Sequence, residues 1–484
     1  MTDFRPFCLP PCAVRVVIAS ALLASSAAHA VRLAPNELGQ ALIFPYYTVN
    51  KSQDTYVSIS NGTASPMVVK VNVLEGRNGR PVLDLVVYLG PNDSWSAAIT
   101  QVDDEGGAML RTQDRSCSTP AIPPAGLHFS ASGYDGTGDL PADDGPADIA
   151  RTREGSVEAI VGGWVEPDTA TARALELDEA GVPVGCASLP GTMPSDIMAT
   201  YSGSLFGYGA IIDVGQGTYF PYDATQIADF TDTALFTANT GPHEPTLLQA
   251  NTEGTATPGG AIANFAITDA FPFQGRVFEA EFERGIDAVS AVLMADQVFN
   301  DFLVAPALGA ATDWVVSFPT WRFYRDPIYP TAWRDVVRLE VAVNGPDGRT
   351  MLPDPSDPTR DDITLPYVVN VIGLTRGTGG GVSPVFGSQL ATHLDPGTDS
   401  GTLRLDIWGH RTGGELVLGG GGFGVYSTAG YIWGVPVSGF MAYNIVNAHA
   451  APGRLANYGG TFAHRQRSCM RIHSIYTRVC STEY

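Results

Sequence analysis

Residues 67–89 read MVVKVNVLEGRNGRPVLDLVVYL, and this stretch decides the fold class of the chain. In its first half valine alternates with Lys70 and Asn72, and in its second half leucine or valine recurs at every second position. The turn dipeptide Asn78-Gly79 separates the two halves. Because side chains of a strand point alternately to the two faces of a sheet, the pattern predicts half-buried antiparallel strands with a turn between them.

The same alternation recurs on both sides of this stretch, and glycine (54) and proline (35) supply the turns that short strands need. One segment, 286–304, instead has apolar residues at helical spacing, with Asp287 as a cap. The sequence therefore predicts an all-β fold of two or more antiparallel, immunoglobulin-like β-sandwich units with one short helix. Strands are expected at 40–48, 54–60, 67–74, 82–89, 94–100, 155–166, 314–318, 336–343, 363–374 and 403–408.

The first 30 residues have the features of a secretory signal peptide: early arginines, a short apolar run and the cleavage pattern Ala28-His29-Ala30. We therefore expect export to the periplasm, the cell surface or the medium. No later segment has about 18 consecutive apolar residues, so no transmembrane segment is expected. The predicted divisions are 1–30 (signal peptide), 31–240 (N-terminal β-sandwich unit with an acidic loop insertion), 241–463 (C-terminal β-rich unit) and 464–484 (basic tail).

The charge of the chain excludes one class of partner. The formal net charge is −22, and Lys51 and Lys70 are the only lysines. Because phosphate binding requires clustered lysine and arginine side chains, no nucleic-acid partner is expected.

Four cysteines remain after removal of the signal peptide. An even number in an oxidising compartment predicts disulfide bonds, and four cysteines allow three pairings. Proximity along the chain favours Cys117–Cys186 and Cys469–Cys480.

Aromatic residues crowd into 312–324, which reads TDWVVSFPTWRFY. Large rings at alternate positions either fill the core between sheets or form an exposed platform for a sugar. We expect Trp314 to lie in the core. Three residues are the candidates for ligand binding, with a polysaccharide as the partner: Trp321, Arg322 and Trp333.

Two sets of carboxylates are further candidates. Glu279, Glu281 and Glu283 alternate along a predicted strand, where a spacing of about 6.6 Å approaches the ~6.5–9.5 Å of an inverting glycosidase pair. The alternative is an ordinary solvated strand face. In the acidic loop, hard oxygen ligands could hold calcium, the one cofactor considered, although solvated turns are the alternative; the residues are Asp135, Asp139, Asp143 and Asp144.

Catalytic motifs are missing from the sequence. It contains no G-x-S-x-G elbow, no H-E-x-x-H pair and no phosphate-binding loop. We therefore expect a non-catalytic secreted cell-envelope or cell-surface protein, structural or adhesive, whose partners are polysaccharides or other cell-surface proteins. The alternative is a carbohydrate-binding protein or a glycoside-active enzyme.

Several phrases of the mature chain resemble a family of secreted Gram-negative bacterial proteins of uncharacterised function. The resemblance extends over most of the mature chain and ends near His464; it implies an exported protein, and its phrases carry no catalytic role that can be transferred. Its aromatic phrase is shared mainly in the apolar part, TDWVV-FPT, which supports placing Trp314 and Phe318 in the core. The phrases are GQALIFPYYTVN (39–50), ARTREG (150–155), AVSAVLMAD (288–296), TDWVVSFPTWRFY (312–324) and GVPVSGFMAYNIVN (434–447), with NYGG (457–460).

Overall fold

The computed structural model describes residues 29–482 with thirteen gaps, and two earlier predictions fall outside the described residues. These are the first 28 residues of the predicted signal peptide and the candidate ligand residue Trp333. The gaps are 36, 103–105, 190–195, 200–202, 237–239, 268–275, 330–336, 353–361, 378, 408–422, 427–429, 448–455 and 473–477.

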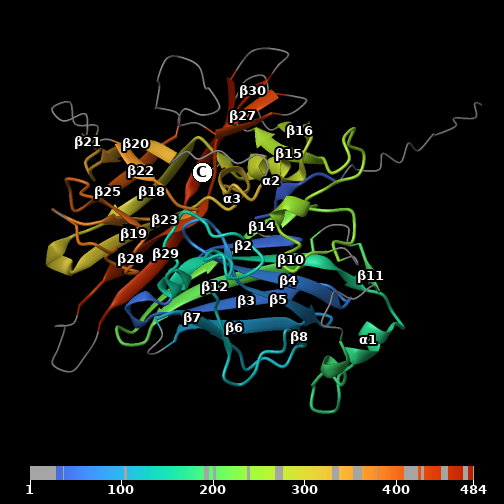
Figure 1. Cartoon of the computed structure of the whole chain (residues 1–484). Coiled ribbons are helices and arrows are strands. Elements are labelled where there is room, and N and C mark those ends of the chain that lie inside the picture. Colours follow the sequence, from blue (N-terminus) through green and yellow to red (C-terminus); the bar gives the residue numbers. More distant parts are fainter. Residues whose placement is uncertain are drawn as a thin grey trace, which may run out of the picture.

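The chain has an all-β fold, and its first half forms two antiparallel sheets, drawn from blue to green in Figure 1. The eight-stranded sheet has the order β1 (Arg32–Leu33), β14 (Thr225–Ala228), β2 (Ala41–Thr48), β10 (Glu154–Val165), β4 (Met67–Glu75), β5 (Pro81–Leu89) and β8 (Ser118–Thr119), with β11 (Ile197–Met198) beside β10. The six-stranded sheet has the order β13 (Thr218–Asp223), β12 (Leu205–Asp213), β3 (Asp54–Asn61), β6 (Ser94–Gln101), β7 (Ala108–Arg111) and β9 (Leu127–His128).

The second half forms a ten-stranded sheet, a five-stranded sheet and a hairpin of β15 (Ala261–Ile267) with β16 (Arg276–Phe282). The larger sheet runs β17 (Met294–Ala295), β27 (Gly430–Pro436), β30 (Arg465–Ile472), β18 (Gln297–Leu303), β25 (Ser400–Asp406), β20 (Val337–Asn344) and β21 (Thr350–Leu352); β22 (Asp362–Leu365), β26 (Phe423–Tyr426) and β31 (Arg478–Thr482) pair with β20, β27 and β30. The smaller sheet runs β24 (Ala391–Leu394), β23 (Val369–Leu374), β19 (Ala310–Ser317), β28 (Ser438–Ile445) and β29 (Tyr458–Ala463).

The alternating pattern of 67–89 forms the predicted antiparallel pair, but β4 is buried on both faces and not half-buried, because Lys70 and Asn72 are buried too. β4 and β5 pair antiparallel, and Val69, Val71 and Val73 of β4 are buried in the core. The same apolar core continues into the second half, where the ring of Phe386 packs 5.4 Å from that of Phe220. The two halves therefore share one core, while the boundary at 240/241 and the immunoglobulin-like identity stay predictions.

Two buried carboxylates, one from each half, hold the segment 383–390. Asp313 of β19 accepts hydrogen bonds from the Ser383 hydroxyl (2.5 Å) and from the backbone N–H of Phe386 (2.8 Å). Glu154 of β10 accepts one from the Ser388 hydroxyl at 2.6 Å. Because each carboxylate is removed from water, these donors supply the hydrogen bonds that water would otherwise make.

The helix prediction is only partly confirmed. α2 (Gly285–Leu293) begins within one residue of the predicted start, but Asp287 lies in its first turn and does not cap it, and residues 297–303 form β18 instead of continuing the helix. β18 pairs with β25 on one side and β30 on the other, and its aromatic and β-branched residues suit a strand. The expectation of a single helix is also wrong, because the described residues include α1 (Ala170–Ala174) and α3 (Arg322–Arg325) as well.

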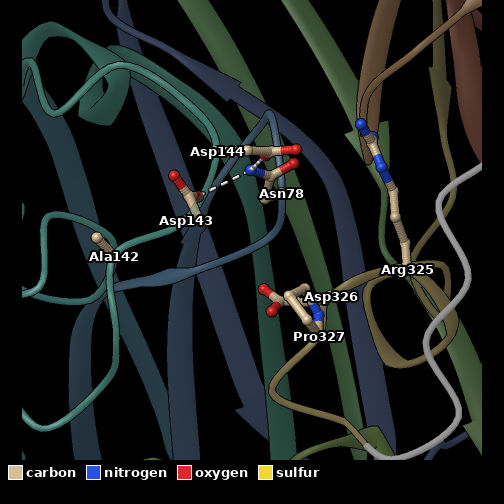
Figure 2. A pocket seen from close by; sticks show the side chains of 7 residues that line it. All are labelled: Asn78, Ala142, Asp143, Asp144, Arg325, Asp326 and Pro327. Carbon is tan, nitrogen blue, oxygen red and sulfur yellow. Dashed lines mark hydrogen bonds between the residues drawn. The ribbon is translucent and has the colours of Figure 1, made fainter.

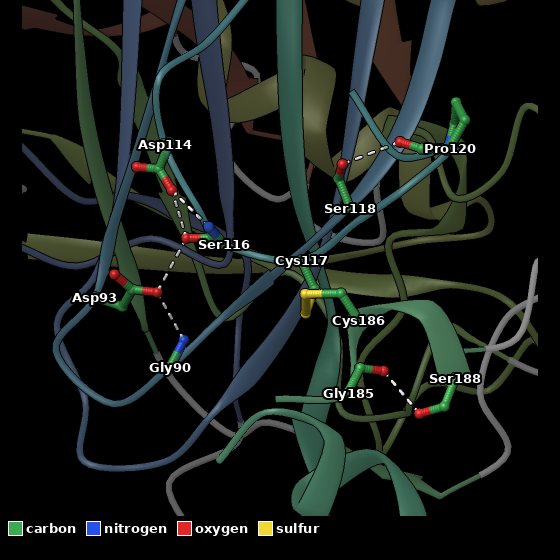
Figure 3. Close-up of a disulfide and its surroundings, with 10 residues drawn as sticks. All are labelled: Gly90, Asp93, Asp114, Ser116, Cys117, Ser118, Pro120, Gly185, Cys186 and Ser188. Atoms are coloured by element: carbon green, nitrogen blue, oxygen red, sulfur yellow. Dashed lines mark hydrogen bonds between the residues drawn. A yellow bond between two sulfur atoms is a disulfide. The ribbon is translucent and has the colours of Figure 1, made fainter. Parts of the chain in front are cut away.

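Both predicted disulfides are formed. Cys117 joins Cys186 beside β5, with their Cα atoms 5.1 Å apart (Figure 3). Cys469 joins Cys480 directly across the pair β30–β31, with a Cα separation of 4.1 Å. The basic segment that begins at residue 464 thus contributes strands to the ten-stranded sheet, with β30 between β27 and β18.

Candidate functional site

The outer face of the six-stranded sheet carries large aromatic side chains that the core does not use. Tyr56 is 48% exposed, Phe206 43%, Tyr208 48% and Tyr219 50%. They come from β3, β12 and β13, which are adjacent in the sheet. We call these four residues the aromatic face.

The strand register places the four rings on one side of the sheet. Phe206 and Tyr208 are two residues apart on β12 and therefore point to the same face. Further along the same face of β12, Ala210 lies opposite Tyr56 of β3. Ile212, the next outward residue of β12, lies opposite Tyr219 of β13. The rings thus extend across three neighbouring strands on one face of the sheet.

β12 shows an inverted distribution of large and small residues. Its inward positions beside the outward rings are Gly207 and Gly209. A Cβ atom at Gly207 would lie 2.9 Å from the ring of Phe44 in the facing sheet, and one at Gly209 would lie 2.2 Å from the ring of Tyr222 on the neighbouring strand β13. Close packing against the facing sheet and against the neighbouring strand therefore requires glycine inside, whereas nothing in the core requires aromatic residues outside.

Hydroxyl groups lie beside the rings. Ser58 pairs with Tyr208 across the strands, and the outward hydroxyls of Ser60 and Ser94 hydrogen bond to each other at 2.7 Å. Partial burial raises the pKa of Asp54, at the end of the face, although the charge of Arg111 opposes the shift. The rings and the nearby hydroxyls together form a surface with apolar ring faces and polar margins, a combination that large recognition surfaces use.

The exposed position predicted for Trp321 is wrong, whereas ligand binding by Trp321 and Arg322 stays a prediction. After Pro319 the chain turns into α3 instead of extending, so Trp321 points inward, is only 4% exposed and packs 6.0 Å from the ring of Phe318. Arg322 is also buried and forms an ion pair with Glu158 at 2.7 Å. Neither side chain lies at the surface, where a sugar ring would stack.

The core expectation for the same stretch is confirmed. Trp314 and Phe318 are both 0% exposed. β19, which carries Trp314, lies between β23 and β28 in the five-stranded sheet.

The glutamates of β16 lie at the surface. Glu279 is exposed, Glu281 is half-buried, and Glu283 is exposed just after the strand ends. The carboxylate of Glu281 accepts a hydrogen bond from the backbone N–H of Ala256. This exposure fits the solvated-face interpretation better than a catalytic pair, which needs one carboxyl group in an apolar setting.

The four aspartates of the acidic loop are engaged by groups of the protein itself. Asp143 pairs with Arg151 at 2.7 Å, and Asp139 contacts a ring nitrogen of His243 at 3.0 Å. Asp135 accepts a hydrogen bond from the backbone N–H of Thr137 in its own turn. Asp144 accepts one from the side-chain amide of Asn78 at 3.2 Å (Figure 2). Within the described residues no group of three or more His, Cys, Asp or Glu side chains is placed to hold a metal ion. Calcium binding by this loop stays a prediction.

The electrostatics of Asp143 explain why it serves the protein's own arginine. Burial alone would raise its pKa, but hydrogen bonds from Arg151 and Asn78 outweigh the burial and hold the pKa below its usual value. The carboxylate is therefore ionised and already has its cationic partner.

Sequence reasoning missed the aromatic face, although 205–213 reads LFGYGAIID and carries its signal. Alternating aromatic residues and glycines predict a strand, and the glycines mark the side on which another layer approaches closely. Comparisons with protein families, with curated proteins and with solved structures find no match for the chain. In the part of the chain that the structure describes, no helix is long and apolar enough to cross a membrane.

Proposed function

We propose that the protein is a non-catalytic, exported cell-envelope or cell-surface protein that adheres to a neutral polysaccharide through the aromatic face. The observation that carries this proposal is the inverted pattern of β12, with Phe206 and Tyr208 outward and glycines inward. Exposed aromatic rings cost solubility, so a face that keeps four of them suits a binding surface.

A polysaccharide fits the chemistry of the face. The apolar faces of sugar rings stack on flat aromatic side chains, and the exposed hydroxyl of Ser94 at the margin of the face can exchange hydrogen bonds with sugar hydroxyls. A sheet face with rings on three adjacent strands suits an extended chain better than a single small molecule, which requires a concave site. Two disulfides and the predicted signal peptide support the export that such a role needs.

The test is a binding assay with the mature protein and insoluble polysaccharides: cellulose, chitin, and purified bacterial exopolysaccharide. Tyr208→Ala should weaken binding about 30-fold, because truncating a central ring of an interface costs about 2 kcal/mol or more. Met351→Ala is the control, since Met351 is also an exposed large apolar residue but lies on β21 of the ten-stranded sheet, away from β3, β12 and β13. Circular dichroism confirms that both variants fold.

Two results would overturn the proposal. One is the absence of binding to every polysaccharide in the panel by the unaltered protein. The other is equal binding by the unaltered protein and the double variant Phe206→Ala/Tyr208→Ala, which would show that the polysaccharide binds elsewhere.

A further inference from the structure

A pocket of about 200 Å³ lies where the acidic loop meets the segment after α3. Figure 2 shows side chains of the two halves of the chain around it. Asn78, Ala142, Asp143 and Asp144 come from the first half, and Arg325, Asp326 and Pro327 from the second.

Two of the four charged residues in this pocket are already neutralised. Asp143 pairs with Arg151, and Asp326 pairs with Arg80, whose Nη2 lies 2.9 Å from the carboxylate. Each of these carboxylates is buried against its arginine. Neither has an unsatisfied charge to offer to a ligand.

The other two charges, Asp144 and Arg325, remain available. Among the described residues, neither forms an ion pair; Asp144 accepts a hydrogen bond from Asn78, and Arg325 donates through Nη1 to the backbone oxygen of Pro366. Burial lowers the pKa of Arg325, whereas the charge of Asp144 is the largest of the influences that oppose this shift. An aspartate and an arginine therefore face one pocket close enough to influence each other without forming a salt bridge.

We propose that this pocket binds a small zwitterion, an α-amino acid with a short side chain, whose ammonium group pairs with Asp144 and whose carboxylate pairs with Arg325. The volume is below the ~300–1,000 Å³ of pockets for drug-sized ligands, so the ligand must be small. Arginine binds carboxylates through two parallel N–H groups, and an exposed aspartate binds an ammonium group.

Opposite charges in one pocket discriminate against simpler ions. A lone anion that reached Arg325 would be repelled by Asp144, and a lone cation at Asp144 would be repelled by Arg325. A divalent metal ion would also need several free oxygen ligands, whereas Asp143 is already engaged by Arg151 and Asn78. A zwitterion satisfies both free charges at once. This site is separate from the aromatic face and does not depend on the function proposed above.

The test is calorimetric titration of the mature, oxidised protein with glycine, L-alanine and L-serine, and with acetate and methylammonium as halves of the zwitterion. The amino acids should bind, and each half should bind at least tenfold more weakly. Asp144→Asn and Arg325→Gln should each lower the affinity for glycine at least tenfold. Asp135→Asn, in the same loop but outside the pocket lining, should leave the affinity unchanged.

Because Arg325 is partly buried, the Arg325→Gln variant could fold poorly, and Arg325→Lys provides a second measurement. It keeps the positive charge but loses the paired N–H groups, so it should bind glycine with intermediate affinity. Absence of heat with all three amino acids at millimolar concentration would overturn the proposal. So would acetate binding as tightly as glycine, which would indicate a simple anion site, or an Asp144→Asn variant with unchanged affinity.

Discussion

A buried histidine should make the protein less stable in mild acid. The His464 ring is buried with its centroid 4.7 Å from that of Trp314. Its Nε2 donates to the backbone oxygen of Val315 at 2.9 Å, and Nδ1 accepts from the side-chain amide of Asn300 at 3.2 Å. These partners fix the neutral ring with its proton on Nε2. A second proton on Nδ1 would be buried and would face a donor.

Burial therefore lowers the pKa of His464 from 6.5 to about 4. Between these values the unfolded chain binds a proton that the folded protein does not, so stability falls as the pH falls. The lowered pKa of His464 contributes about 3 kcal/mol in full to the free energy of unfolding, and about 2 kcal/mol of this is lost between pH 7 and pH 5. This contribution is complete above pH 6.5 and disappears as the pH passes through 4.

The assay is urea unfolding, followed by tryptophan fluorescence, at pH 7 and pH 5 for the unaltered protein and for His464→Gln. The pH-dependent loss of unfolding free energy should be about 2 kcal/mol smaller in the variant, whatever its stability at pH 7. His128→Gln is the control, because His128 is an exposed histidine of β9. This variant should show the same pH-dependent loss of unfolding free energy as the unaltered protein. Equal losses in the unaltered protein and His464→Gln would refute this reasoning.

Two other predictions concern stability. Burial raises the pKa of Asp313 to about 6, so its contribution has the opposite sign: it is fully present at low pH and is lost as the pH rises through 6. Asp313→Asn, in the same urea assay, should remove a stabilisation of about 1 kcal/mol that develops between pH 7 and pH 5; an unchanged pH profile would contradict the argument. Replacing Cys117 and Cys186 by serine should cost more than replacing Cys469 and Cys480, about 4 against about 3 kcal/mol, because the first pair closes a separation of 69 residues and the second one of 11. Thermal unfolding of the two double variants measures the order, and the reverse order would show that local packing outweighs loop closure.

The parts of the fold that the sequence predicted are those where local pattern and environment agree. In strands such as β4, apolar residues alternate with polar ones, so the period of two reveals them directly, although β4 is buried on both faces. The disulfide pairs were also predictable, because the partners are the nearest cysteines along the chain.

The errors arose where distant segments decide the outcome. Residues 297–303 have helical spacing, yet β25 and β30 supply hydrogen bonds on both sides and make them a strand. Arg322 was expected at the surface, but it reaches the buried carboxylate of Glu158, 164 residues away. The aromatic face was missed for a related reason: which side of β12 is the inside depends on Phe44 and Tyr222 of other strands.

The position of β30 sets the order in which the molecule can be completed during synthesis. A chain that is made from its N-terminus delivers β18 long before residues 465–467, which pair with it. Until those residues emerge, β18 has an open edge there that can pair with other chains. A chain interrupted shortly before residue 465 would therefore keep most of its core residues but would be prone to aggregation at that edge.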